Sequence, residues 1–144
     1  MTAPAEAVVD ASVALKWVLN EPGSPWARAL PTGPVLVAPP LLWTECANGL
    51  WRLARAVPSL DAGRAFGVVS TVPVETVEAG LPIQARALWL GGELGHPIYD
   101  CLYLALALDR GAALATADRR FLRVLRRTAI LPPERLLAPP EAAP

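Results

Sequence analysis

The chain has 144 residues, of which 53% are apolar, so it has the length of one domain and enough apolar material for a proper core. Two domains would each be too small. Its 13 basic and 13 acidic residues cancel, and this balance argues neither for nor against a nucleic-acid partner. Charges or prolines interrupt the apolar runs well short of the roughly 20 residues that a bilayer span needs, and no secretion signal precedes residue 10. We therefore expect a soluble, cytoplasmic protein without a membrane segment.

Short apolar runs between turn residues predict five strands. In chain order they cover residues 7–9, 35–37, 72–74, 113–115 and 129–131. The segments between them have helical periodicity, and the predicted helices cover residues 12–19, 26–30, 41–56, 60–69, 76–90, 98–108 and 119–127. Ser12 is the predicted N-cap of the first helix and Thr76 that of the fifth, which Pro82 interrupts. Pro73 predicts a short or edge strand, because proline cannot donate a ladder hydrogen bond.

Strands that alternate with helices predict parallel pairing and a sheet covered by helices. We predict an α/β fold, a three-layer α/β/α domain with a central, mainly parallel sheet, over residues 1–137. The Pro-rich residues 138–144 are predicted to form a disordered tail. Cys46 and Cys101 lack CxxC spacing and lie in apolar surroundings, so both are predicted to be reduced core residues.

Four acidic side chains are placed where predicted strands end or helices begin. Asp10 and Asp118 end apolar strands, while Asp100 lies in the first turn of its helix. Glu45 lies in the first third of the long helix over 41–56. In an open α/β sheet, ligands bind beyond the carboxyl ends of the strands. These four carboxylates are therefore candidates for a common site.

A common site for these acids requires a cation. Two carboxylates about 4 Å apart repel each other by about 4 kcal/mol at an effective dielectric of 20. Oxygen ligands alone favour Mg²⁺ or Mn²⁺ over zinc, and the chain has no cluster of histidines and thiols. His96, the only histidine, is predicted to cap a helix or to close the turn before Pro97.

Each acid also has a structural alternative, and Asp10 can be exposed or can cap the helix that follows it. Asp100 can favour a helix N-terminus through the helix dipole, worth roughly 0.3–1 kcal/mol, and Asp118 can cap the helix that follows it. Glu45, between Trp43 and Cys46 on an otherwise apolar helix, can instead face solvent. From the residues alone, these alternatives stay open.

Four motifs resemble those of PIN-domain toxins of the VapC type, in the same order and within one domain length. They are Val8-Val-Asp10-Ala-Ser12 followed by Lys16-Trp17, Glu45-x-x-Asn48, His96-Pro-Ile-Tyr-Asp100-Cys-Leu-Tyr-Leu-Ala, and Ala115-Thr116-Ala117-Asp118-Arg-Arg-Phe121. The resemblance covers about residues 8–121. Any one motif is weak, but the ordered set of four is specific.

The resemblance implies an endoribonuclease toxin that a small cognate antitoxin neutralises. It assigns Mg²⁺ or Mn²⁺ to Asp10, Glu45, Asp100 and Asp118. It also implies that water, activated by the metal, is the nucleophile, which gives 5′-phosphate and 3′-hydroxyl products. Polar supporting roles go to Ser12, Asn48 and Thr116, whose side chains can hold a carboxylate or a metal-bound water. A homodimer or a toxin–antitoxin hetero-oligomer is the expected assembly.

Two arginine groups are candidate RNA contacts near the acids. Arg52 and Arg55 share one helical stripe with Glu45 and Asn48. A second group follows Asp118 and consists of Arg119, Arg120, Arg123, Arg126 and Arg127. Both groups are also compatible with a solvated helix face or with antitoxin docking.

Three rival functions are compatible with parts of this pattern. A receiver domain needs an acidic pair after the first strand and a late lysine, and the chain has neither. A PIN-fold binding module without nuclease activity and a nuclease that prefers single-stranded DNA both stay open. The first would show no metal-dependent cleavage, and the second would cut single-stranded DNA as fast as RNA.

Overall fold

The structure is a computed structural model and describes residues 2–141. Its strands are β1 (Glu6–Val9), β2 (Val35–Ala38), β3 (Glu75–Thr76), β4 (Ala113–Ala115) and β5 (Leu136–Leu137). Its α-helices are α1 (Ala11–Leu15), α2 (Ser24–Ala29), α3 (Leu41–Ala56), α4 (Ala62–Val69), α5 (Leu81–Leu94), α6 (Ile98–Arg110) and α7 (Arg119–Thr128). Two short 3-10 helices cover Leu30–Thr32 and Pro133–Arg135.

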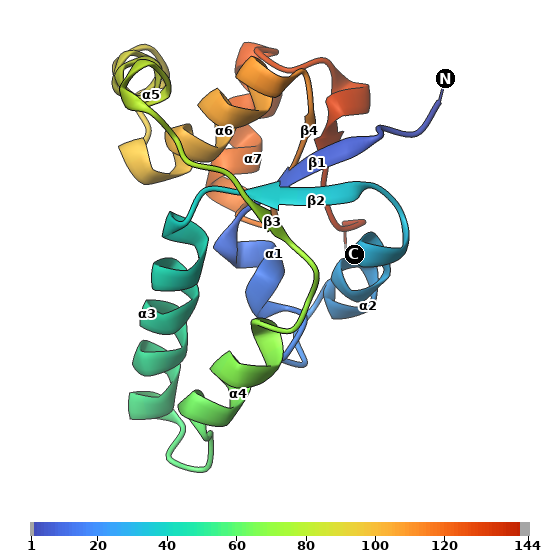
Figure 1. Cartoon of the computed structure of the whole chain (residues 1–144), viewed down its shortest axis with the longest axis vertical. Helices are drawn as coiled ribbons and strands as arrows, with labels where there is room; N and C mark the ends of the chain where they lie inside the picture. The colour runs from blue at the N-terminus through green and yellow to red at the C-terminus, as the bar shows by residue number, and fades with distance from the viewer. Residues whose placement is uncertain (1, 142–144) are drawn as a thin grey trace.

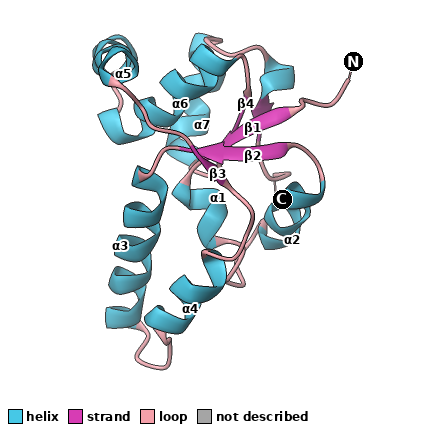
Figure 2. Ribbon diagram, viewed as in Figure 1, coloured by secondary structure: helices cyan, strands magenta, loops and turns pink. Residues whose placement is uncertain are grey.

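The five strands form one sheet in the order β3-β2-β1-β4-β5, and each neighbouring pair is parallel (Figure 2). At the centre, Val8 on β1 pairs with Val37 on β2 and with Leu114 on β4. These three side chains are fully buried, as expected for central strands that are covered on both faces. The apolar runs at these strands were therefore readable from the sequence.

Helices cover both faces of this sheet, which confirms the predicted three-layer fold. Figure 1 shows α1 to α4 on one side of the sheet and α5 and α6 on the other. Right-handed crossovers account for this arrangement, because strand order runs outward from β1 to β3 and then restarts at β4. The strand order thus reverses between β1 and β4, and this switch point is where an open α/β sheet offers a ligand site.

Two of the predicted strands are wrong. The strand expected at 72–74 is instead β3, whose two residues extend the sheet edge beside Val37 and Ala38. The strand expected at 129–131 is instead β5, because Ala129 adopts a left-handed conformation (φ 50°) that ends α7. Both real strands have two residues, so their pairing partners rather than their own side chains define them.

The fifth predicted helix is shifted along the chain. The prediction began it at Thr76, but Thr76 belongs to β3 and the helix runs over Leu81–Leu94. Pro82 lies in its first turn, where proline needs no hydrogen bond, so this proline begins the helix rather than interrupting it. Gly95, with φ 60°, ends α5 in the left-handed conformation that favours glycine.

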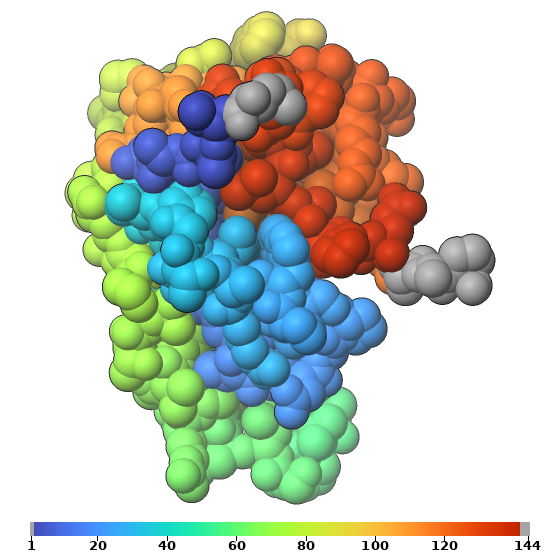
Figure 3. Space-filling model, turned by 90° about the vertical axis from the view of Figure 1, so that its right-hand side faces the viewer, coloured from blue at the N-terminus to red at the C-terminus, as the bar shows by residue number. Residues whose placement is uncertain are grey.

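The C-terminal residues lie over the end of α1 and the start of α2. Figure 3 shows this segment, in red, against the light-blue residues around α2. A Cβ built on Gly23 would lie 3.0 Å from the Cβ of Pro139, so the two segments pack closely. Residues 142–144 of the predicted disordered tail lie outside the described residues. Within residues 2–141, no helix is both long enough and apolar enough to cross a membrane.

Gly91 and Gly92 on α5 offer a matched test of how tightly α5 packs on the start of α6. A Cβ on Gly91 would lie 3.2 Å from the backbone oxygen of His96 and 3.1 Å from Ile98 Cγ1, whereas one on Gly92 would meet nothing within 4 Å. We expect Gly92→Ala to stabilise the protein by about 0.5–1 kcal/mol through helix propensity. Gly91→Ala should lose this gain or destabilise the protein, and equal stabilisation of both variants in urea unfolding would contradict this packing.

Candidate active site

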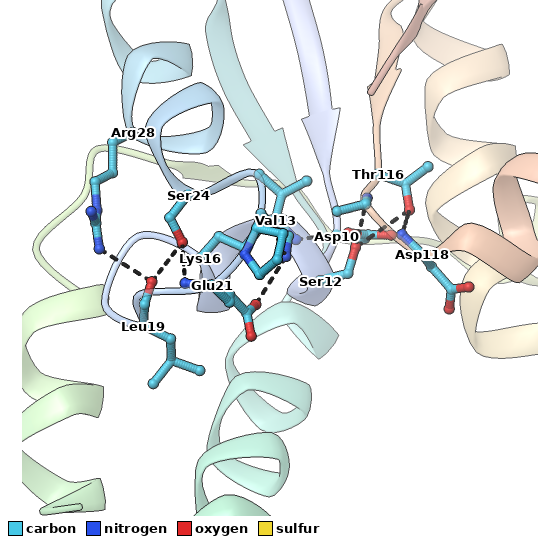
Figure 4. A network of polar contacts seen from close by, with 12 residues as sticks. Asp10, Ser12, Val13, Lys16, Leu19, Glu21, Ser24, Arg28, Thr116 and Asp118 are labelled. Carbon is cyan, nitrogen blue, oxygen red and sulfur yellow. Dashed lines mark hydrogen bonds and ion pairs between the residues drawn. The ribbon is translucent and has the colours of Figure 1, made fainter. Parts of the chain in front are cut away.

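Asp10 lies directly after β1 and is almost fully buried, with 3% of its surface exposed. Its Oδ1 accepts hydrogen bonds from the Val13 amide at 3.2 Å and from the Ser12 hydroxyl at 2.5 Å (Figure 4). Asp10 is therefore the N-cap of α1, and the prediction that Ser12 caps this helix is wrong. Both residue types suit an N-cap, but Ser12 lies inside α1 and acts on Asp10 instead.

Ser12 and Thr116 join the loop after β1 to the loop after β4. The Ser12 hydroxyl accepts a hydrogen bond from the Ala117 amide at 2.9 Å and lies 3.4 Å from Thr116 Oγ1. Thr116 Oγ1 in turn accepts from the Asp118 amide at 3.2 Å. The two hydroxyls thus fix the backbone that carries Asp10 and Asp118 at the switch point.

Asp118 caps α7, as the structural alternative for this residue proposed. Its Oδ1 accepts a hydrogen bond from the Phe121 amide at 3.1 Å. Its side chain is partly exposed, and its charge acts on Asp100, whose pKa it helps to raise. Capping and membership of an acidic cluster are therefore compatible for this carboxylate, because the cap uses only one of its oxygens.

Two buried side chains near the start of α6 hold the other two acids. His96 Nε2 lies 2.6 Å from Asp100 Oδ2, and the Tyr103 hydroxyl donates to Glu45 Oε1 at 2.5 Å. His96 is 6% exposed and Tyr103 is fully buried. His96 closes the turn before Pro97 through its backbone amide, which donates to Gly91 O at 3.2 Å, while its side chain contacts a carboxylate and does not cap the helix. Tyr103 also explains Glu45, which turns toward α6 from an otherwise apolar helix.

Burial and mutual repulsion raise the pKa values of three of the acids. Burial raises the pKa of Asp10 from 3.8 to about 7, against the lowering effect of its hydrogen bonds, and the charge of Asp100 adds to the rise. Burial also raises the pKa of Glu45, again with a contribution from Asp100. The pKa of Asp100 is raised by burial and by Asp118, while its hydrogen bond with His96 opposes the rise. Asp100 is thus the acid that interacts electrostatically with each of the other three.

The donor set is suited to a hard divalent cation. It consists of carboxylate oxygens with hydroxyls beside them, which are the ligands that Mg²⁺ and Mn²⁺ prefer. Within residues 2–141, no three His, Cys, Asp or Glu side chains are arranged to hold one ion together, and protein donors engage Asp10, Asp100 and Glu45. Burial is the largest cause of the raised pKa values of Asp10, Glu45 and Asp100, and repulsion among the acids adds to it, whereas His96 lowers the pKa of Asp100.

The other predicted site residues are exposed. Asn48, Arg52 and Arg55 are exposed on α3, and the Arg55 guanidinium lies 5.0 Å from the centre of the Trp51 ring. Arg119, Arg120 and Arg123 are exposed on α7. Sequence reasoning missed His96, Tyr103 and Phe121 as neighbours of the acids. Only the separation of four residues between His96 and Asp100, at the start of α6, signalled such a contact.

A groove of about 810 Å³ begins beside Ala117, next to Asp118. Four basic side chains line it, namely Lys16, Arg119, Arg123 and Arg126. Two acids also line it and pair with them: Lys16 Nζ lies 3.0 Å from Glu21 Oε1, and Arg126 lies 3.5 Å from Glu141. The groove therefore has an excess of positive charge, which Glu21 and Glu141 partly neutralise.

The chain thus has an open parallel α/β sheet with acids at its switch point. These features place it in the class of small α/β proteins with an acidic site. The family model of the PIN domain matches residues 7–126 of the chain. The chain therefore belongs to the PIN domain family. This match contains all four acids and both hydroxyl residues, Ser12 and Thr116.

Solved structures have the same fold. PAE2754 from Pyrobaculum aerophilum is 25% identical, with a TM-score of 0.65 over 83% of this chain and 84% of that one. A toxin–antitoxin complex from Klebsiella pneumoniae is 18% identical, with a TM-score of 0.65 over 94% of this chain and 99% of that one. VapC20 from Mycobacterium tuberculosis, a toxin that cleaves the sarcin-ricin loop, is 18% identical, with a TM-score of 0.62 over 81% and 93%. No curated protein matched the chain.

Proposed function

We propose that this protein is a Mg²⁺- or Mn²⁺-dependent endoribonuclease toxin that works in the cytoplasm and that a cognate antitoxin neutralises. The observation that carries the proposal is the coupling of Asp10, Glu45 and Asp118 through the charge of Asp100 at the switch point of the sheet. Carboxylates that repel one another in a half-buried site are typical of a metal-dependent hydrolase. The fold shared with two proteins from toxin–antitoxin systems supports the toxin assignment.

Asp10, Glu45, Asp100 and Asp118 are the residues that would hold the cation. A bound divalent cation would supply Lewis acidity, lowering the pKa of a water and offsetting charge on the phosphate. Ser12 and Thr116 keep Asp10 oriented at the strand end, and the amide of Phe121 keeps Asp118 in place. Tyr103 directs Glu45 toward α6. The chain's own contribution is thus a rigid, partly dehydrated set of oxygens.

Metal-dependent cleavage by the purified protein is the test of this function. We expect cleavage of end-labelled RNA in Mg²⁺ or Mn²⁺, none in EDTA, and products with 5′-phosphate and 3′-hydroxyl ends. Asp100→Asn serves as the inactive comparison. Products with a 2′,3′-cyclic phosphate would contradict the mechanism. Equal cleavage of single-stranded DNA would identify the DNA-preferring alternative, and metal-independent binding without cleavage would identify a binding module.

The basic groove beside Asp118 supports RNA binding next to the acids. Arg123 lines this groove, whereas Arg127 is exposed on the same helix and is not among the groove's lining residues. We expect Arg123→Glu to weaken RNA binding in EDTA about 10-fold and to reduce the slope of log K against log salt by about 1–2. Arg127→Glu makes the same charge change and should have a smaller effect in fluorescence anisotropy titrations. Equal effects of the two variants would argue for non-specific attraction.

Exposed apolar side chains support a protein partner. Leu88 and Trp89 on α5 and Tyr99 on α6 are each at least 60% exposed. Such side chains on neighbouring helices are typical of interaction surfaces. We propose that a cognate antitoxin, a second copy of the chain, or both cover them, which gives a homodimer or a toxin–antitoxin hetero-oligomer.

A further inference from the structure

The His96 ring is buried and packs face to face with the ring of Phe121. The ring centroids lie 4.7 Å apart, with an angle of 10° between the planes. Phe121 is fully buried and His96 is 6% exposed, so both rings belong to the core beneath the acids. Neither residue is one of the proposed cation ligands. A buried histidine with a defined stacking partner and a carboxylate partner is a fixed element rather than a mobile surface group.

These two rings connect two of the proposed ligands. The amide of Phe121 donates to Asp118 Oδ1 at 3.1 Å, and its ring stacks on His96. On the other side, His96 Nε2 lies 2.6 Å from Asp100 Oδ2. With the carboxylate ionised, Nε2 carries the hydrogen and donates it. A continuous series of contacts therefore runs from Asp118 at the β4–α7 junction to Asp100 at the start of α6.

The backbone of His96 is also held in place. Its amide donates to Gly91 O at 3.2 Å, and its carbonyl oxygen accepts from Cys101 Sγ at 3.8 Å. A Cβ on Gly91 would lie only 3.2 Å from that same carbonyl oxygen, so α5 packs directly against this turn. The backbone of His96 is therefore fixed, and stacking on Phe121 limits the tilt of the His96 ring.

Asp100 needs such a restraint because its neighbours repel it. Asp118 raises the pKa of Asp100 by its charge, and Asp100 has the same effect on Asp10 and Glu45. A half-buried carboxylate under this repulsion gains by rotating away toward solvent. The short hydrogen bond with His96 opposes that rotation.

We propose that His96 and Phe121 are a pair of positioning residues that hold the Asp100 carboxylate in register with Asp118 and thereby set the affinity of the site for a divalent cation. The inference rests on the proposed function, because it concerns the same four acids. It assigns a role to two buried rings that the proposed chemistry does not otherwise use. Partners that orient a ligand typically contribute 10- to 100-fold in metal affinity or activity.

The test is the dissociation constant of Mn²⁺ by titration calorimetry, without RNA. His96→Leu fills the ring's space but cannot donate, and we expect it to weaken Mn²⁺ binding about 10- to 100-fold. His96→Gln places an amide N–H near Nε2 and should bring the affinity back to within about threefold of wild type. Phe121→Leu keeps an apolar side chain but removes the flat stacking surface, so it should give an intermediate loss.

Leu90→Ala is the control for a merely structural effect. Leu90 is buried on α5, a helix that carries none of the four acids, and the variant should lose about 2–5 kcal/mol of stability but keep wild-type Mn²⁺ affinity while folded. Equal weakening by His96→Leu and His96→Gln, or wild-type affinity in both, would overturn the inference while leaving the proposed function standing. A wild-type protein that binds no Mn²⁺ would overturn both.

Discussion

Asp10→Asn is expected to make the metal-free protein more stable at pH 8 and at the same time to remove metal-dependent cleavage. Burial raises the pKa of Asp10 from 3.8 to about 7. Between these two values the folded protein keeps a proton that the unfolded chain releases, so ionisation of Asp10 lowers stability as the pH rises through this window. The pKa difference corresponds to about 4 kcal/mol of folding stability, and in the absence of a cation this stability is lost by pH 8.

Asparagine removes most of this cost. Its amide oxygen still accepts from the Val13 amide and the Ser12 hydroxyl, but as a weaker acceptor than a carboxylate. We therefore expect a net gain of about 1–2 kcal/mol at pH 8 and little gain at pH 4. Cleavage should fall on the order of 100- to 1,000-fold, because the site loses one of its charged oxygen ligands.

Urea unfolding in EDTA at pH 4, 6 and 8 measures the stability part of this prediction. Asp61→Asn is the matched control, because Asp61 also caps a helix, accepting from the Arg64 amide at 3.0 Å, but it is exposed. That change should alter stability by only a few tenths of a kcal/mol, since Asn and Asp cap equally well. A loss of stability in Asp10→Asn at pH 8 would mean that the fold itself requires the charge.

A bound divalent cation should reverse the order of stability of wild type and Asp10→Asn. A ligand that binds only the folded state stabilises it in proportion to the logarithm of its concentration above the dissociation constant. Wild type should therefore gain stability in Mg²⁺ or Mn²⁺ and Asp10→Asn should not. The same substitution is thus stabilising without a cation and relatively destabilising with one, which distinguishes a ligand from an ordinary helix cap.

The central strands and the positions of the acids were predictable because they depend on local patterns. Residues 7–9 and 113–115 are apolar runs that any buried parallel strand requires, so Asp10 and Asp118 could be placed just beyond strand ends. The edge strands β3 and β5 were not predictable in this way. Each consists of two residues that hydrogen-bond to a neighbouring strand, and their own sequence carries almost no signal.

The partners of the acids were out of reach of the sequence for a related reason. Tyr103 lies 58 residues from Glu45, and Thr116 lies 104 residues from Ser12, so only the tertiary packing brings these pairs together. The bond between His96 and Asp100 spans four residues and had a local signal. The sequence did not show that the His96 side chain binds a carboxylate, because the position of this ring depends on its packing against Phe121.

Asp100→Asn should have the largest effect of any single charge change, because Asp100 is the centre of the acidic cluster. The charge of Asp100 raises the pKa of both Asp10 and Glu45, and the charge of Asp118 raises the pKa of Asp100. We expect cleavage to fall on the order of 1,000-fold and Mn²⁺ binding to become undetectable by calorimetry. Asp109→Asn on the exposed part of α6 is the control and should cleave like wild type.

Asp100→Asn also removes one source of repulsion from its neighbours. This second effect distinguishes a cation ligand from a residue that only raises the pKa of nearby carboxylates. Without Asp100, the pKa of Asp10 and of Glu45 should fall, so these carboxylates compete less with protons for a cation. If Asp100 acted only by raising the pKa of its neighbours, the variant would bind Mn²⁺ more tightly at pH 6 than wild type. If Asp100 is a ligand, the affinity for Mn²⁺ falls at every pH. The double variant Asp10→Asn/Asp100→Asn should then cleave no more slowly than either single variant, because the effects of residues that act as a unit are not additive. Cleavage by Asp100→Asn at the wild-type rate would remove the acidic cluster from the mechanism.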